Sequence, residues 1–125
     1  MKVRPMFLLL AAMGLIPIAL SYGLMPKQSL NYLFDISVTN TNNIHIYRAV
    51  MGLYLAMVLF WIIGAIKVQV RQAALYSLVI FMLGLAGGRI LSLIIDGIPH
   101  LLLLIYLMLE LGFGISGIIL LKKLD

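Results

Sequence analysis

Apolar residues along this chain gather in four long runs that are separated by short polar or turn-forming segments. The runs cover approximately residues 6–25, 46–66, 73–95 and 101–121. Each run is about as long as the roughly 20 helical residues that are needed to cross a hydrocarbon core of about 30 Å. The pattern therefore predicts an all-α fold: an integral membrane four-helix bundle in which residues 1–125 form a single transmembrane domain.

The breaks between these runs contain polar or helix-ending residues. Pro26 follows the first run, the segment 67–72 (KVQVRQ) separates the second run from the third, and the segment 96–100 (DGIPH) separates the third from the fourth. Proline and glycine punctuate helices, and charged residues mark the membrane boundary. These breaks predict short turns after the second and third spans.

The long break at residues 26–45 is rich in Asn, Thr and Ser, and it predicts an outer loop that crosses the top of the bundle. Residues 30–34 within it are expected to form a short interfacial turn. Tyr32 and Phe34 would then lie at headgroup level, where aromatic side chains are common.

Basic residues predict the orientation, because Lys and Arg near the ends of a span resist translocation. One side of the predicted spans carries six of them: Lys2, Arg4, Lys67, Arg71, Lys122 and Lys123. The loops of the other side carry only Lys27. We therefore expect both chain ends on the cytoplasmic side, with the long loop outside.

The first run also resembles a secretory signal, since MKVR precedes it and Ala19, Leu20 and Ser21 could form a cleavage site. Its length of about 20 residues exceeds the 7 to 15 residues of a typical signal core. We therefore expect an uncleaved helix.

Composition narrows the function classes. The chain is 64% hydrophobic and 10% charged, whereas soluble domains are about half apolar and a quarter charged. The formal charge of +5 comes from basic residues scattered at the ends of apolar runs, so no nucleic-acid partner is expected. Cysteine is absent, which excludes disulfides and thiolate chemistry. No phosphate-binding glycine loop or haem-type histidine pair is present, and no cofactor is expected.

Small residues recur at the spacing of close helix packing. These rows are Gly52, Ala56 and Gly64 in the second span, Gly84 and Gly88 in the third, and Gly112 and Ser116 in the fourth. Such rows let helix backbones approach closely in lipid. They predict packing within the bundle, with a homo-oligomer interface or a membrane-protein partner as the alternative.

Three ionisable residues lie inside the predicted spans: Arg48, Arg89 and Glu110. Each costs about 2.5 to 3.5 kcal/mol at the centre of a span, so each calls for a reason. At 1.5 Å per residue, Arg89 lies roughly 10 Å and Glu110 roughly 13 Å below the outer boundary. Depths that agree within one side-chain length, in two spans joined by a short turn, predict a direct ion pair between Arg89 and Glu110.

Helical periodicity extends this pair to a larger polar cluster in the outer half of the membrane. Arg89, Ser92 and Asp96 share one face of the third span, and Tyr106 shares a face with Glu110 in the fourth. Polar residues of the second span lie at similar depth. The predicted ligand-binding residues are Arg48, Tyr54, Arg89, Ser92, Asp96, Tyr106 and Glu110.

This cluster supports several functions. Our leading hypothesis is a pocket, open to the outer leaflet, that binds a lipid-like or small amphiphilic molecule, with Arg48 and Arg89 as anion contacts. Structural ion pairs in an accessory subunit of a membrane complex are the first alternative. A membrane enzyme with Glu110 as general acid or base is the second, and a small oligomeric transporter is the third.

A metal site is not expected, although His45, Asp96 and His100 would all lie near the outer mouth. These residues come from separate segments and lack the HxxxH or HxxE spacing of metal-binding helices.

Three stretches resemble the small bacterial membrane family called domain of unknown function 4345. They are residues 47–61 (YRAVMGLYLAMVLFW), 84–97 (GLAGGRILSLIIDG) and 106–112 (YLMLELG). The family's pattern positions are occupied here by Arg48, Gly52, Tyr54, Arg89, Ser92, Asp96, Gly97 and Glu110. The resemblance implies a four-helix protein of the bacterial inner membrane, and it implies no established activity.

Overall fold

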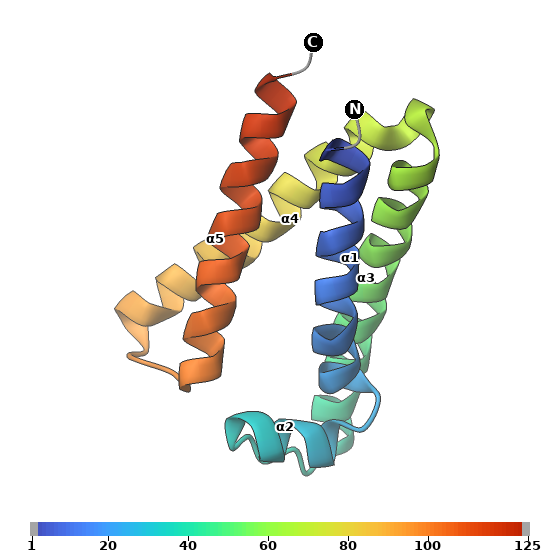
Figure 1. The fold of residues 1–125 in the computed structure, drawn as a ribbon. Coiled ribbons are helices and arrows are strands. Elements are labelled where there is room, and N and C mark those ends of the chain that lie inside the picture. The colour runs from blue at the N-terminus through green and yellow to red at the C-terminus, as the bar shows by residue number, and fades with distance from the viewer. Residues whose placement is uncertain (1–2, 124–125) are drawn as a thin grey trace.

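Five helices make up most of the chain in the computed structural model, which describes residues 3–123. They are α1 (Val3–Gly23), α2 (Pro26–Phe34), α3 (Thr41–Ile66), α4 (Val68–Ile95) and α5 (Leu101–Lys122), and this part of the chain contains no strand (Figure 1). All but α2 are long and apolar enough to cross a membrane. The all-α prediction is confirmed, and the four long helices indicate a multi-pass membrane protein.

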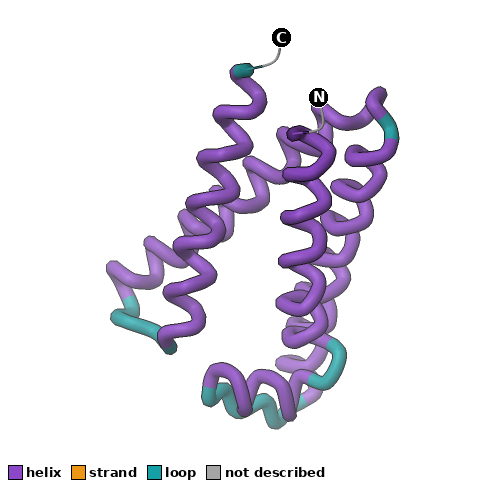
Figure 2. Tube along the Cα trace, in the orientation of Figure 1, coloured by secondary structure: helices purple, strands orange, loops and turns teal. Residues whose placement is uncertain are grey.

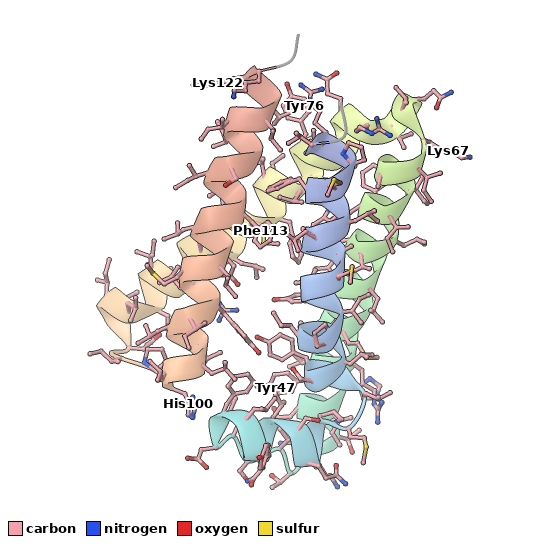
Figure 3. The ribbon with its side chains drawn as sticks, in the orientation of Figure 1. Tyr47, Lys67, Tyr76, His100, Phe113 and Lys122 are labelled. Carbon is pink, nitrogen blue, oxygen red and sulfur yellow. The ribbon has the colours of Figure 1, made fainter. Side chains whose placement is uncertain are left out.

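The long helices form two pairs. α1 lies beside α3, and together they form one pair. α4 and α5 form a hairpin, which is the second pair, and α4 packs against α3 to join the two pairs (Figure 1). α1 begins and α5 ends at the same end of the molecule, which we call the terminal end (Figure 2). The opposite end, the turn end, holds α2 and the turn 96–100 between α4 and α5. α1 and α5 meet toward the terminal end, where the rings of Phe7 and Phe113 lie 5.4 Å apart (Figure 3).

α2 corrects the prediction of a loop at residues 26–45. It is a helix of nine residues that begins with Pro26. Proline suits the first turn of a helix because it lacks the backbone N–H, which would have no acceptor within the helix there. Leu30 and Phe34, four residues apart, point into the bundle and are almost fully buried, whereas Tyr32 is 88% exposed. Phe34 therefore belongs to the core and not to the membrane interface.

α3 and α4 both begin earlier than the apolar runs indicate. The Asn40 side chain accepts a hydrogen bond from the Asn43 backbone N–H at 2.8 Å, so α3 starts at Thr41. Lys67 alone separates α3 from α4, where a break over residues 67–72 is expected. Polar residues in these first turns break the apolar pattern although the backbone there is already helical, so a search for apolar runs places both starts too late.

The glycines at close contacts are largely different from those in the predicted rows. Gly64 packs so closely on α4 that an added Cβ would overlap Ala74, and Gly114 and Gly117 of α5 leave no room beside α4. In contrast, an added Cβ at Gly52, Gly84, Gly88 or Gly112 would meet nothing within 4 Å. Of the glycines in the predicted rows, Gly64 is the one whose close contact with another helix leaves no room for a Cβ.

Candidate functional site

Arg89 of α4 and Glu110 of α5 form a direct ion pair. The Nε atom of Arg89 donates to Oε1 of Glu110 at 2.9 Å and to Oε2 at 3.1 Å. The Glu110 side chain is 9% exposed, and that of Arg89 is 21% exposed. Within residues 3–123 it is the one pair of opposite charges in contact. The pairing predicted from equal depth is therefore confirmed.

Three tyrosines surround this ion pair. The Arg89 guanidinium carbon lies 5.7 Å from the centre of the Tyr106 ring. Tyr54 of α3 is buried and lies near both charged groups, and Tyr22 of α1 lies close to the guanidinium. The rings of Tyr22 and Tyr54 meet edge to face at 5.5 Å. Each spanning helix thus contributes to what we call the ion-pair cluster: Tyr22, Tyr54, Arg89, Tyr106 and Glu110.

Tyr22 is the member of this cluster that the sequence analysis misses. It lies on the buried stripe of α1 with Leu15 and Ala19, at helical spacing. A tyrosine on such a stripe needs a polar partner for its hydroxyl, which is a usable signal. The signal is easily overlooked because the first run carries no charged side chain between Arg4 and its end.

α2 closes the turn end of the ion-pair cluster through one aromatic side chain. The Phe34 ring lies 6.0 Å from that of Tyr106 and 6.2 Å from that of Tyr22. It also meets His100 edge to face at 6.2 Å, at the start of α5 (Figure 3). A helix from the predicted loop therefore links α1 to α5 beneath the ion pair.

Arg48 does not join the ion-pair cluster. Its terminal nitrogen donates to the backbone carbonyl of Gly23 at 2.9 Å and to that of Leu24 at 3.5 Å, at the end of α1. Its side chain is exposed, and no contact links it to Arg89 or Glu110 among residues 3–123. The last carbonyls of a helix lack partners within that helix, so an arginine there acts as a cap.

Ser92 lies one turn beyond Arg89 on α4, and Asp96 follows a further turn on, as the residue that caps the end of this helix. The Ser92 hydroxyl donates to Oδ2 of Asp96 at 2.7 Å, and both residues are exposed. Within the described part of the chain, no cation pairs with Asp96. The turn end of this face of α4 thus carries a carboxylate whose charge is not balanced by a neighbouring residue within residues 3–123.

A groove of about 360 Å³ runs between α4 and α5 at the turn end. The Arg89 guanidinium and the Ser92 hydroxyl are its polar side chains, and glycine, proline and leucine supply the rest. The lining residues are Gly84, Leu85, Gly88, Arg89, Ser92, Leu93, Gly97, Pro99, Leu103, Leu104 and Leu107. Because no atom lies within 4 Å of a Cβ added at Gly84 or Gly88, these two residues keep the groove open.

A second cavity of about 60 Å³ lies between α1 and α5, on the other side of the ion pair. Glu110, Tyr54 and Tyr106 line it together with apolar side chains. Arg89 faces the groove and Glu110 faces this smaller cavity, so the ion pair stands between the two spaces. Of the predicted site residues, the groove collects Arg89 and Ser92, and the small cavity collects Tyr54, Tyr106 and Glu110.

The histidines have other partners. Nδ1 of His100 accepts a hydrogen bond from the Leu102 backbone N–H at 3.1 Å, which caps α5. His45 is exposed near the start of α3. Over residues 3–123, no three side chains of the metal-binding types come together.

Comparison with known proteins gives one result. Neither a curated protein nor a solved structure matches the chain. The family model described as "Domain of unknown function (DUF4345)" matches residues 4–121, which is nearly the whole chain. That span includes the four long helices, the ion-pair cluster and the groove, and on this match the protein belongs to the DUF4345 family.

Proposed function

We propose that this protein binds a lipid-like or small amphiphilic molecule in the groove between α4 and α5. The polar headgroup contacts Arg89 and Ser92 at the groove wall. The hydrocarbon portion lies along Gly84, Gly88 and the leucines of α5. The molecule enters sideways from the surrounding lipid at the turn end of the bundle.

The main support for this proposal is that Arg89 has hydrogen-bond donors in excess of its protein acceptors. A guanidinium has five N–H donors, and Glu110 accepts from Nε. Even with Tyr22 close by, most of the remaining donors lack a protein acceptor among residues 3–123. Unsatisfied polar groups in an apolar environment are costly, so these donors require water or a headgroup.

The size and lining of the groove suit a small amphiphile. Ligand sites commonly have volumes of about 300 to 1,000 Å³ and combine apolar walls with a few polar groups. The groove, at about 360 Å³, is at the lower end of this range. It therefore accommodates a headgroup and part of one chain better than a whole phospholipid.

Orientation is part of the same proposal. Five basic residues lie at the terminal end: Arg4, Lys67, Arg71, Lys122 and Lys123. Lys27 and the exposed Arg48 lie at the turn end, and Lys2, which also counts in the prediction, is outside the described residues. Since basic residues resist translocation, we place both chain ends in the cytoplasm and the turn end on the periplasmic side of a bacterial inner membrane.

Native mass spectrometry of the protein released from its membrane tests the proposal. We expect a bound small molecule on the natural protein and its loss from Gly88→Leu, because Gly88 lines the groove, an added Cβ there meets nothing within 4 Å, and the rest of the leucine would occupy the groove. Gly87→Leu is the matched control. Gly87 is the preceding residue, is equally open, and does not line the groove.

Two results would contradict this proposal. One is a bound molecule that persists in Gly88→Leu at the same occupancy as in Gly87→Leu. The other is the absence of any bound molecule from the natural protein together with failure of added single-chain amphiphiles to bind it.

A further inference from the structure

The charges beside the groove are already balanced or negative. The Arg89 cation is paired with Glu110, so the pair has no net charge. Ser92, at the groove wall, donates to Asp96, and no cation pairs with this second carboxylate in the described part of the chain. Arg48, the other predicted cation of this site, bonds to the end of α1.

A headgroup in this groove therefore meets hydrogen-bond donors without an excess of positive charge. An anion would add a third charge beside a neutral pair, in surroundings where an uncompensated charge is costly. It would also lie near the Asp96 carboxylate. An uncharged oxygen acceptor would satisfy the same Arg89 donors without this penalty.

We infer, on the basis of the proposed function, that the groove selects an uncharged headgroup that accepts hydrogen bonds. Suitable acceptors are carbonyl, ester, ether and hydroxyl oxygens. This inference replaces the expectation that Arg89 is an anion contact, which the sequence suggests because arginine commonly binds carboxylates and phosphates. In this structure the local carboxylate of Glu110 already fills that role.

Glu110 is a positioning residue in this scheme. It does not line the groove, yet it accepts hydrogen bonds from Nε of Arg89, which leaves the other guanidinium donors without Glu110 as their partner. Its negative charge also neutralises the positive charge of Arg89, which would otherwise attract an anionic headgroup. Its removal should therefore change which headgroup binds, and not only how tightly.

Two photoreactive probes with the same alkyl chain and diazirine test this inference. One carries an uncharged alcohol headgroup, and the other carries a sulfonate, which stays anionic throughout the accessible pH range. Each probe is titrated into lipid nanodiscs that contain the natural protein or Glu110→Gln. Labelling of the α4 and α5 peptides gives an apparent Kd for each probe.

For the natural protein we expect the alcohol probe to bind about tenfold more tightly than the sulfonate, or better, since an uncompensated charge in such a site costs more than one factor of ten. Glu110→Gln keeps an oxygen acceptor for Nε but leaves Arg89 with net charge, so the preference should reverse in favour of the sulfonate. A structural role for Glu110 alone would weaken both probes equally.

The outcomes separate the inference from the proposed function. The inference would be overturned if the natural protein preferred the sulfonate, or if the preference were unchanged in Glu110→Gln. In either case, binding that is lost in Gly88→Leu would still support the groove as the binding site. Labelling by neither probe, or labelling that Gly88→Leu does not reduce, would overturn both.

Discussion

Arg48 and Arg89 lie in neighbouring spans, and they bond to different kinds of acceptor. Arg48 is exposed near the turn end and donates to the backbone carbonyl of Gly23, where α1 finishes. Arg89 is half-buried within α4 and donates to a carboxylate on the next helix. One cation closes a helix end, and the other joins two helices in the interior of the bundle.

The remaining arginines behave like Arg48. Arg71 donates to the carbonyls of Gly64 and Ala65 at the end of α3, at 2.9 and 2.8 Å. Arg4 donates to the Leu120 carbonyl near the end of α5 at 3.0 Å. The last carbonyls of a helix are free to accept, whereas carbonyls in its middle are occupied by the helix itself. An arginine in mid-span therefore needs an acceptor from a side chain or a bound molecule.

The largest expected effect comes from Arg89→Ala. This change leaves the Glu110 carboxylate buried without a partner, which should lower the free energy of unfolding by about 3 to 5 kcal/mol. Denaturant titration in detergent micelles, followed by circular dichroism, measures the loss. A loss no larger than that of Arg48→Ala would remove the distinction between the two arginines.

A double-mutant cycle then shows whether the stability depends on the pairing itself. Glu110→Gln in the Arg89→Ala background should recover part of the lost stability, because the amide needs no cation. Losses from Arg89→Ala and Glu110→Gln that simply add would be incompatible with a direct ion pair.

The part of the site that the sequence predicts is the part set by depth. Arg89 and Glu110 lie at similar distances from the turn that joins their helices, and both residues belong to spans that are adjacent in the chain. A short turn forces such helices to be neighbours, so equal depth brings the two side chains together. The same reasoning finds the four spanning helices, because span length is fixed by membrane thickness.

Depth does not give the direction in which a side chain points, and the incorrect predictions for Arg48, Gly84 and Gly88 follow from this. Arg48 lies in the same half of its predicted span as Arg89, but it turns toward the end of α1. Phe34 belongs to a helix too short and too polar to be recognised by an apolar run. Gly84 and Gly88 have the spacing of a helix interface, yet they face an open groove. Direction depends on which helices pack together, and that is a property of the whole bundle.

An intermediate effect is expected from Arg71→Ala. Two hydrogen bonds to the end of α3 are lost, and the residue is only partly buried, so the free energy of unfolding should fall by about 1 to 2 kcal/mol. Hydrogen exchange followed by mass spectrometry should also show faster exchange confined to the junction of α3 and α4. Faster exchange in the α4 and α5 hairpin would mean that Arg71 does more than cap a helix.

The smallest effect is expected from Arg48→Ala. One short hydrogen bond to Gly23 and a longer one to Leu24 are lost at an exposed site, which should lower the free energy of unfolding by about 0.5 to 1 kcal/mol.

Binding of the alcohol probe to Arg48→Ala should stay within twofold of that of the natural protein, because Arg48 does not line the groove. Arg89→Gln should weaken the same probe about tenfold, as expected when the guanidinium donors are removed from the groove wall. Equal weakening by Arg48→Ala and Arg89→Gln would show that the two cations act on one ligand after all, and it would restore the single shared site that their depth in the membrane suggests.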